Sequence, residues 1–253
     1  MVKKRVIPVL LLKDGRMVKG RQFKDYRDTG DPKSAVRIYN AQDADELVFL
    51  DIQASLQSRG ALVEIVRNAA TESFMPLTVG GGVTSTDDVR ELLRAGADKV
   101  VITTAAVKQP GLIRAAAEMF GAQCVVAGID YRGSGADARV WLHCGTEETS
   151  HHPVALAKSF AEQGAGEIFL NSIDRDGCME GYDLEMAAQV ADAVPVPVIV
   201  CGGAGHFMHL AEALQQTAVS AVACASLFHF GDNNPIRARS YLRNLKIPLR
   251  VLK

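Results

Sequence analysis

Eight short runs rich in valine, isoleucine and leucine recur along the chain, and the spacing between them repeats. They begin near Val6, Val48, Leu77, Val100, Cys124, Ile168, Val198 and Ala221. The intervals are 42, 29 and 23 residues, then 24, then 44, 30 and 23. Amphipathic patterns such as DDVRELLRAG separate the runs, and this alternation is typical of βαβ units around a parallel sheet. The repeated intervals therefore predict two similar halves.

The two halves are also similar in sequence, at an offset of about 120 residues. VFLDIQAS (48–55) resembles IFLNSIDR (168–175), and PLTVGGG (76–82) resembles PVIVCGG (197–203). Eight such units close most economically into one (β/α)₈ TIM barrel, with functional residues after the strands at the C-terminal face. We predict a single α/β barrel over residues 1–253, with half-barrels of about 1–120 and 121–253. The alternative is an open doubly wound sheet, but an even repeat gives it no topological switch point.

The composition argues against several kinds of partner. Lysine and arginine number 28 against 29 acidic residues, and no basic run is longer than Lys3-Lys4-Arg5, so nucleic acid and anionic membranes are not expected ligands. No window approaches the roughly 18 apolar residues of a membrane span. Five cysteines without a C-x-x-C pair favour a reducing, cytoplasmic location. The six histidines form no ligand set with cysteines or acids, so we predict neither a metal nor a cofactor.

Glycine-rich turns follow the third and seventh runs, at 80–82 and 202–205. Glycine lets backbone N–H groups approach an anion closely, and small hydroxyl residues at the ends of the fourth and eighth runs can complete each site. Two symmetric sites predict a ligand with a phosphate at each end. The alternative is that the glycines only form tight turns. The predicted phosphate-binding residues are Gly82, Thr103 and Thr104 in the first half and Gly177, Gly203, Ala225 and Ser226 in the second.

Acidic residues also stand where strands are expected to end. A carboxylate there projects into the barrel mouth, where desolvation and neighbouring charges tune it for proton transfer. Asp130, after VVAGI, is the best candidate for a general acid or base, the alternative being a structural hydrogen-bond acceptor. Asp51 and Asp174 are weaker candidates. Asp176 precedes Gly177, so its alternative role is to shape the loop.

Four charged residues lie instead at the starts of expected strands: Arg5, Glu46, Lys99 and Glu167. Charges at the N-terminal rim of a barrel commonly stabilise it. By position alone, these four residues predict a ring of salt bridges that closes the bottom of the barrel.

Several motifs, in order, resemble the cyclase subunit of imidazole glycerol phosphate synthase over essentially the whole chain. They include RVIPVLLLKDGRMVKGRQF, DPKSAVRIYNAQDADELVFLDI, LTVGGGV, LLRAGADKV, NSIDRDG, GYDLE, GGAG and SLFHFG. In that family a glutaminase docks on the N-terminal face, and ammonia crosses the barrel to a bisphosphorylated ribulosyl aminoimidazole substrate. The resemblance implies that the four rim charges form the ammonia gate and that Asp98 contacts the partner. It also implies that Lys19, Asp51 and Asp176 assist Asp130 in catalysis.

The chain departs from this family at two positions. Leu11 stands where the family has the first of two catalytic aspartates, and an alkyl group cannot transfer a proton. Losing one of two acid/base groups commonly costs about 10² to 10⁴ in rate. Thr103 replaces a usual asparagine at the first phosphate site.

The pattern IP-x-LLLK resembles a branch found in bacterial surface-polysaccharide clusters, in which the barrel supplies ammonia for acetamidino sugars without cyclase chemistry. We predict such an ammonia-conducting, glutaminase-binding barrel. One alternative is an active cyclase of histidine biosynthesis that forms imidazole glycerol phosphate and AICAR. A remote alternative is a phosphosugar isomerase. The polar segment from Gly20 to Pro32 is expected to be a mobile lid over the mouth.

Overall fold

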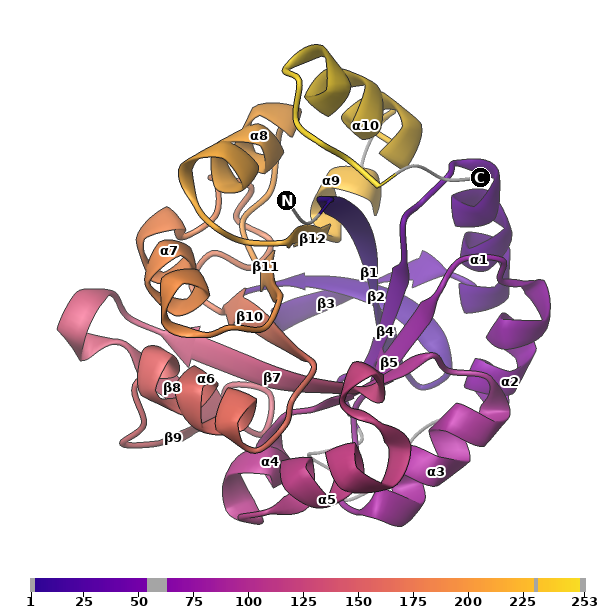
Figure 1. Ribbon diagram of the computed structural model, residues 1–253. Coiled ribbons are helices and arrows are strands. Elements are labelled where there is room, and N and C mark those ends of the chain that lie inside the picture. Colours follow the sequence, from indigo (N-terminus) through magenta and orange to yellow (C-terminus); the bar gives the residue numbers. More distant parts are fainter. Residues whose placement is uncertain (1–2, 54–62, 230–231, 251–253) are drawn as a thin grey trace.

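The computed structural model describes residues 3–53, 63–229 and 232–250. Within them, eight parallel strands form a closed ring, and the longer helices lie around its outside (Figure 1). The order around the ring is β1-β4-β5-β6-β7-β10-β11-β12, and it closes because β12 pairs with β1. The predicted (β/α)₈ barrel is confirmed.

The eight ring strands are β1 (Arg5–Lys13), β4 (Leu47–Asp51), β5 (Leu77–Gly80), β6 (Lys99–Ile102), β7 (Val125–Arg132), β10 (Glu167–Ser172), β11 (Val198–Cys201) and β12 (Ala221–Cys224). Each begins within one residue of the start expected from the apolar runs. The agreement follows from burial, because parallel strands covered on both faces are near-continuous apolar runs.

The described helices are α1 (Pro32–Ala41), α2 (Val63–Glu72), α3 (Thr86–Ala95), α4 (Thr104–Lys108), α5 (Leu112–Phe120), α6 (Pro153–Glu162), α7 (Leu184–Ala193), α8 (Phe207–Gln216), α9 (Ser226–His229) and α10 (Pro235–Asn244), with 3₁₀ turns at Ala122–Cys124 and Gly135–Asp137. Local signals set their ends. Ser85 caps α3 in a capping box, and Gly96 ends it with a left-handed φ of 112°. None of the described helices has the length and apolar character to cross a membrane.

Two hairpins extend the ring strands at the C-terminal face. β2 (Arg16–Arg21) and β3 (Lys24–Gly30) continue from β1, whereas β8 (Arg139–Leu142) and β9 (Glu147–Glu148) continue from β7. The segment expected to be a lid loop is therefore mostly a β-hairpin. The sequence analysis missed these strands because their residues are largely polar and show no sustained alternation.

The inside of the barrel is layered from one end to the other. Side chains two residues apart on a strand share a face, so on β10 Glu167, Phe169 and Asn171 follow one another from the N-terminal end to the mouth. The middle of the interior is apolar. Its cluster contains Ile7, Val9, Leu11, Val18, Val48, Val101, Val126, Phe169, Ile199, Cys201, Ala221 and Ala223. Charged groups lie below this layer and polar groups above it.

Candidate functional site

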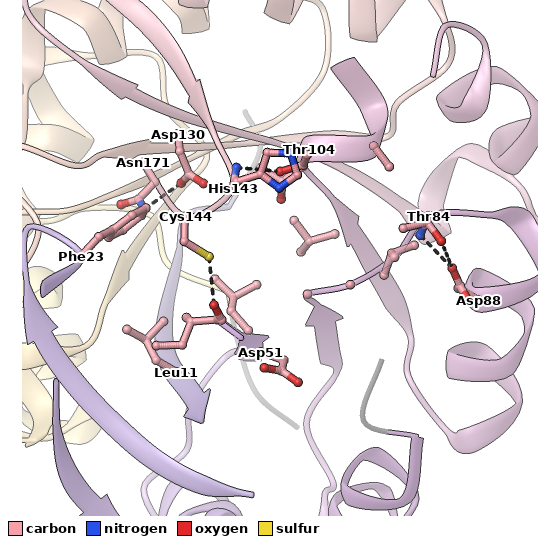
Figure 2. Close-up of a pocket in the computed structure, with 18 of the residues that line it drawn as sticks. Leu11, Phe23, Asp51, Thr84, Asp88, Thr104, Asp130, His143, Cys144 and Asn171 are labelled. Carbon is pink, nitrogen blue, oxygen red and sulfur yellow. Dashed lines mark hydrogen bonds between the residues drawn. The ribbon is translucent and has the colours of Figure 1, made fainter. Parts of the chain in front are cut away.

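A cavity of about 520 Å³ opens at the C-terminal face of the barrel. Figure 2 shows Leu11, Asp51, Asp130 and Asn171 among the side chains around it. The lining also includes Phe23 in the β2–β3 turn, Tyr26 of β3, the turn Gly81-Gly82, Thr103, Thr104, Lys108, His143 and Cys144. Most of these residues come from the first half of the chain, with the β8–β9 turn closing one side.

Asp130 lies near the end of β7. Its side chain is partly exposed, and it lines the cavity. Its neighbour on β10 is Asn171, whose Nδ2 donates to Asp130 Oδ1 at 3.0 Å. Burial raises the pKa of Asp130 to about 6; the Asn171 hydrogen bond opposes this rise, and the charge of Asp176 adds to it. Asp130 can therefore exchange a proton near neutral pH.

Leu11 occupies the corresponding place at the end of β1. It lines the same cavity and is 8% exposed. Its neighbours in register are Leu50 on β4 and Val18 on β2, so its surroundings are apolar. This part of the mouth offers hydrophobic contact to a ligand and no proton.

Lys19 and Asp176 form a buried ion pair between β2 and the loop after β10. Lys19 Nζ lies 2.8 Å from Asp176 Oδ1, and the two residues are 3% and 7% exposed. Asp176 Oδ2 is buried and has no hydrogen-bond partner among the described residues. Asp176 thus forms a buried ion pair in addition to its position in the loop, where its predicted alternative role was to shape the loop.

The other two acidic candidates differ in position. Asp51 lines the cavity, is 6% exposed, and its Oδ1 accepts a hydrogen bond from the Gln53 backbone at 2.9 Å. Asp174 is exposed at the outer rim, where it contacts Arg132 and the Gly133 backbone. Asp51 is therefore near the other site residues, and Asp174 lies outside the cavity.

The three residues predicted for the first phosphate site all line the cavity: Gly82, Thr103 and Thr104. The neighbouring Gly81 has a φ of 103°, and a β-carbon there would lie 2.2 Å from the Asp51 carbonyl oxygen. Only glycine fits this close approach. The glycine at position 81 therefore determines the backbone conformation of this turn at the first predicted phosphate site.

Two basic residues that could not be singled out from the sequence flank this first site. Lys108 and His143 line the cavity, and both approach Glu147 Oε2, at 2.8 Å and 3.5 Å. The His143 backbone also donates to Thr104 Oγ1 at 3.1 Å. No sequence motif announces this arrangement, because the β8–β9 hairpin brings its members together.

The residues predicted for the second phosphate site are placed differently. Gly177, Gly203, Ala225 and Ser226 line neither this cavity nor the polar crevice between β7 and α7. The tip of the β2–β3 hairpin lies against Gly177, where a β-carbon would be 2.4 Å from the Gly20 carbonyl oxygen. The Gln22 backbone donates to the Asp176 carbonyl at 2.8 Å. In this structure the hairpin therefore lies against the loop that contains Gly177.

At the opposite end of the barrel, the four rim charges form a closed ring. Arg5 lies 2.8 Å from Glu46 and 2.9 Å from Glu167, and Lys99 lies 2.9 Å and 3.0 Å from the same two carboxylates. Glu46 is fully buried and also accepts from Thr78 Oγ1 at 2.6 Å. Burial opposes ionisation of Glu46, but Lys99 and Arg5 outweigh it and lower its pKa.

The surface beside this ring combines a charge with exposed apolar groups. Asp98 is exposed, and its Oδ2 accepts from the Leu77 backbone at 2.8 Å. Phe74, in the loop before β5, is 96% exposed. At the end of α5, Met119 is 52% exposed and Phe120 lies under Arg90 at 5.7 Å. Exposed large apolar side chains on one face of a protein can mark a protein-binding surface.

The described part of the chain contains no cluster of three or more histidine, cysteine or acidic side chains placed to hold a metal ion. All five cysteines are free thiols.

Comparison with known proteins identifies relatives over the full length. The family model described as "Histidine biosynthesis protein" matches residues 5–234. The chain is 48% identical over 252 residues to "Imidazole glycerol phosphate synthase subunit HisF" of Hyphomonas neptunium (strain ATCC 15444), covering 100% of both chains. These matches agree with the resemblance found in the sequence motifs. They favour the histidine-biosynthesis alternative over the surface-polysaccharide prediction, which neither match supports.

Proposed function

The chain belongs to the histidine biosynthesis protein family, and on that basis we propose that it is the cyclase-type subunit of an imidazole glycerol phosphate synthase. In this role it receives ammonia from a glutaminase and uses it at the barrel mouth, as a lyase that forms imidazole glycerol phosphate and AICAR. One observation supports the proposal most strongly: a single barrel interior joins a ring of four charges at one end to Asp130 at the other.

The interior suits the passage of neutral ammonia. Above the ring, the inward side chains are apolar, including Ile7, Val101 and Phe169. An apolar lining disfavours ions, so ammonium is excluded and ammonia reaches the mouth as the nucleophile. The ring itself must open or shift to admit ammonia, because its four ion pairs close the N-terminal end.

At the mouth, Asp130 is the group best suited to proton transfer. Addition of ammonia to a substrate carbon requires that protons leave the nitrogen and reach the departing group. Asp130, with its pKa near 6, can accept and return a proton. Leu11 cannot take part, so a second proton transfer falls to another group. The buried Asp51 lines the same cavity, and the Lys19–Asp176 pair lies close enough for the charge of Asp176 to act on Asp130.

The phosphate ends of the substrate provide a second contact. We propose that Gly82, Thr103 and Thr104 bind one phosphate in the open cavity. The second phosphate would bind at Gly177, Gly203, Ala225 and Ser226 after the β2–β3 hairpin moves. A crystal soaked in phosphate is expected to show anions at both places. Well-occupied anions only elsewhere would contradict the two-phosphate proposal.

We propose that the glutaminase binds the N-terminal face through a surface that includes Asp98 and the exposed Phe74. This surface borders the ring, so a bound glutaminase would release ammonia directly at Lys99 and its partners. A cytoplasmic location remains a prediction from the cysteine content.

Turnover measurements with two ammonia sources test the proposed function. The purified chain is given the bisphosphorylated substrate with ammonium salt at high pH, and then with glutamine and the glutaminase. We expect imidazole glycerol phosphate to form in both cases. Glutaminase binding without any product from either source would instead support the variant amidotransferase barrel, which Leu11 favours.

A further inference from the structure

A buried amide side chain lies in the mouth beside Asp130. Asn171 is 6% exposed, although it lines the cavity. It stands on β10 at the position that faces Asp130 on β7 and Cys201 on β11. On the same strand face, Phe169 lies below it in the apolar interior. Asn171 is thus among the first polar side chains above the apolar layer.

The two ends of this amide have different surroundings. Nδ2 donates to Asp130 Oδ1 at 3.0 Å, and Figure 2 shows the amide directed at that carboxylate. Oδ1 is buried and has no hydrogen-bond partner within the described residues. It faces Gly202, where an added β-carbon would lie 3.1 Å away. The bond to Asp130 is therefore the contact that orients the amide.

Stability does not explain why an amide occupies this position. A buried polar atom without a partner costs about 1–3 kcal/mol, which is comparable to what a hydrogen bond to a charged group contributes. A leucine has the same branching and the same number of side-chain heavy atoms, and it would leave no unsatisfied oxygen. The amide is therefore expected to serve the site and not the core.

Asn171 differs from the charged and titratable groups around Asp130 because it donates a hydrogen bond to the carboxylate. Asp176 faces Asp130 from the loop after β10 and disfavours a second negative charge, although Lys19 on β2 partly offsets it. Tyr26 on β3 and Cys201 on β11 are neutral near pH 7, and burial raises the pKa of each further. In the part of the chain that the structure describes, Asn171 is the side chain that donates a hydrogen bond to Asp130.

We propose that Asn171 is a positioning residue for Asp130: its N–H fixes Asp130 Oδ1 and so keeps the carboxylate ionised and oriented toward the cavity. The use of that carboxylate in catalysis rests on the function proposed above. The hydrogen bond and its effect on ionisation are properties of this chain without substrate, so they can be tested separately. Without this bond, burial and the charge of Asp176 would shift Asp130 further toward its protonated form, so a smaller fraction of it could accept a proton at neutral pH.

The test is a carbon-13 NMR titration of the full chain labelled at the aspartate carboxyl carbons. Asp130→Asn identifies the Asp130 signal. In Asn171→Leu, we expect the pKa of Asp130 to rise, with about a tenfold higher proton affinity. Cys201→Ala is the matched control, because Cys201 is the neighbour of Asn171 in register and is also buried. The control should leave the Asp130 titration unchanged.

Two further measurements separate positioning from a structural role. The melting temperature of Asn171→Leu should equal or exceed that of the unmodified chain. Asn171→Thr, which keeps a donor, should restore part of the normal titration. In ammonium-dependent turnover, the acidic limb of the kcat/KM profile should move to higher pH. The shift should equal the rise in the pKa of Asp130 seen in the NMR titration. If Asn171→Leu does not fold, Asn171→Ala removes the same donor.

The outcomes distinguish this proposal from the proposed function. An unchanged Asp130 titration in Asn171→Leu would overturn the positioning role, whether or not the chain turns over substrate. A raised proton affinity in a chain without any cyclase turnover would uphold the positioning of Asp130 and contradict the proposed function.

Discussion

The ends of β1 and β7 show how two similar halves can differ in chemistry. Both strands are long, with nine and eight residues, and both continue into an antiparallel partner at the mouth. Leu11 faces Val18 across the first hairpin, and Asp130 faces Trp141 across the second. The backbone arrangement is repeated, but the carboxylate is not. The fold fixes where a functional side chain can stand, and the residue decides what it does there.

The two hairpins also cross over between the halves. The β2–β3 hairpin of the first half contacts Asp176 in the second through the backbone of Gln22. The β8–β9 turn of the second half contacts Thr104 in the first through the backbone of His143. Each half therefore reaches across the mouth and contacts the other half. We propose that the halves meet near residue 120, between α5 and β7.

Restoring the missing carboxylate tests this asymmetry with the largest expected gain. Leu11→Asp should raise ammonium-dependent turnover about 10- to 100-fold, because a second acid/base group commonly contributes at least that much. It should also lower stability by about 1–3 kcal/mol, since position 11 is buried. Steady-state kinetics and a thermal melt measure both effects.

Leu11→Asn is the control for this change, because it is polar and cannot exchange a proton. Equal rates for the Asp and Asn variants would show that the end of β1 has no part in proton transfer.

Opening the ring tests the opposite end of the barrel. Lys99→Ala removes two ion pairs but leaves Glu46 bonded to Arg5 and Thr78, so the loss of stability should stay near 1–3 kcal/mol. The ratio of glutamine-dependent to ammonium-dependent product formation should change about tenfold. The same substitution at Lys158, exposed on α6, should change neither quantity. An unchanged ratio with a large drop in melting temperature would assign the ring to stability alone.

The smallest predicted effect concerns how the free energy of unfolding depends on pH, and it follows from the raised pKa of Asp130. Its value is about 6 in the folded chain, against 3.8 for an unperturbed aspartate. Between these values the folded state binds more protons than the unfolded state, so stability falls as the pH rises through this window. Asp130→Asn should therefore be more stable than the unmodified chain at pH 8, by about 1–3 kcal/mol. Denaturant unfolding should show this gain disappear below about pH 4, and a gain independent of pH would contradict it.

The fold could be predicted from the sequence because its main determinant is local. Each buried strand is a continuous apolar run, and the glycine at 81 marks a turn that no other residue fits. The sequence also shows that Leu11 replaces an aspartate, because the flanking motif places position 11 near the end of the first strand.

The contacts within the site could not be predicted, because they join distant residues. Asn171 meets Asp130 across 41 positions, and Lys19 meets Asp176 across 157. Neither pair has a sequence spacing that implies contact, and closure of the barrel brings them together. The covering hairpins were missed for a related reason: their pairing depends on the long ring strands from which they continue.

The most direct test of the account is the ammonium-dependent turnover of Asp130→Asn beside Asp174→Asn. Both substitutions remove one carboxylate near the C-terminal face, but Asp174 lies outside the cavity, where it contacts Arg132. The account predicts that Asp130→Asn loses about 10² to 10⁴ in kcat and that Asp174→Asn stays close to the unmodified chain. Equal turnover in the Asp130 variant and the unmodified chain would contradict the central claim that proton transfer at the mouth depends on Asp130.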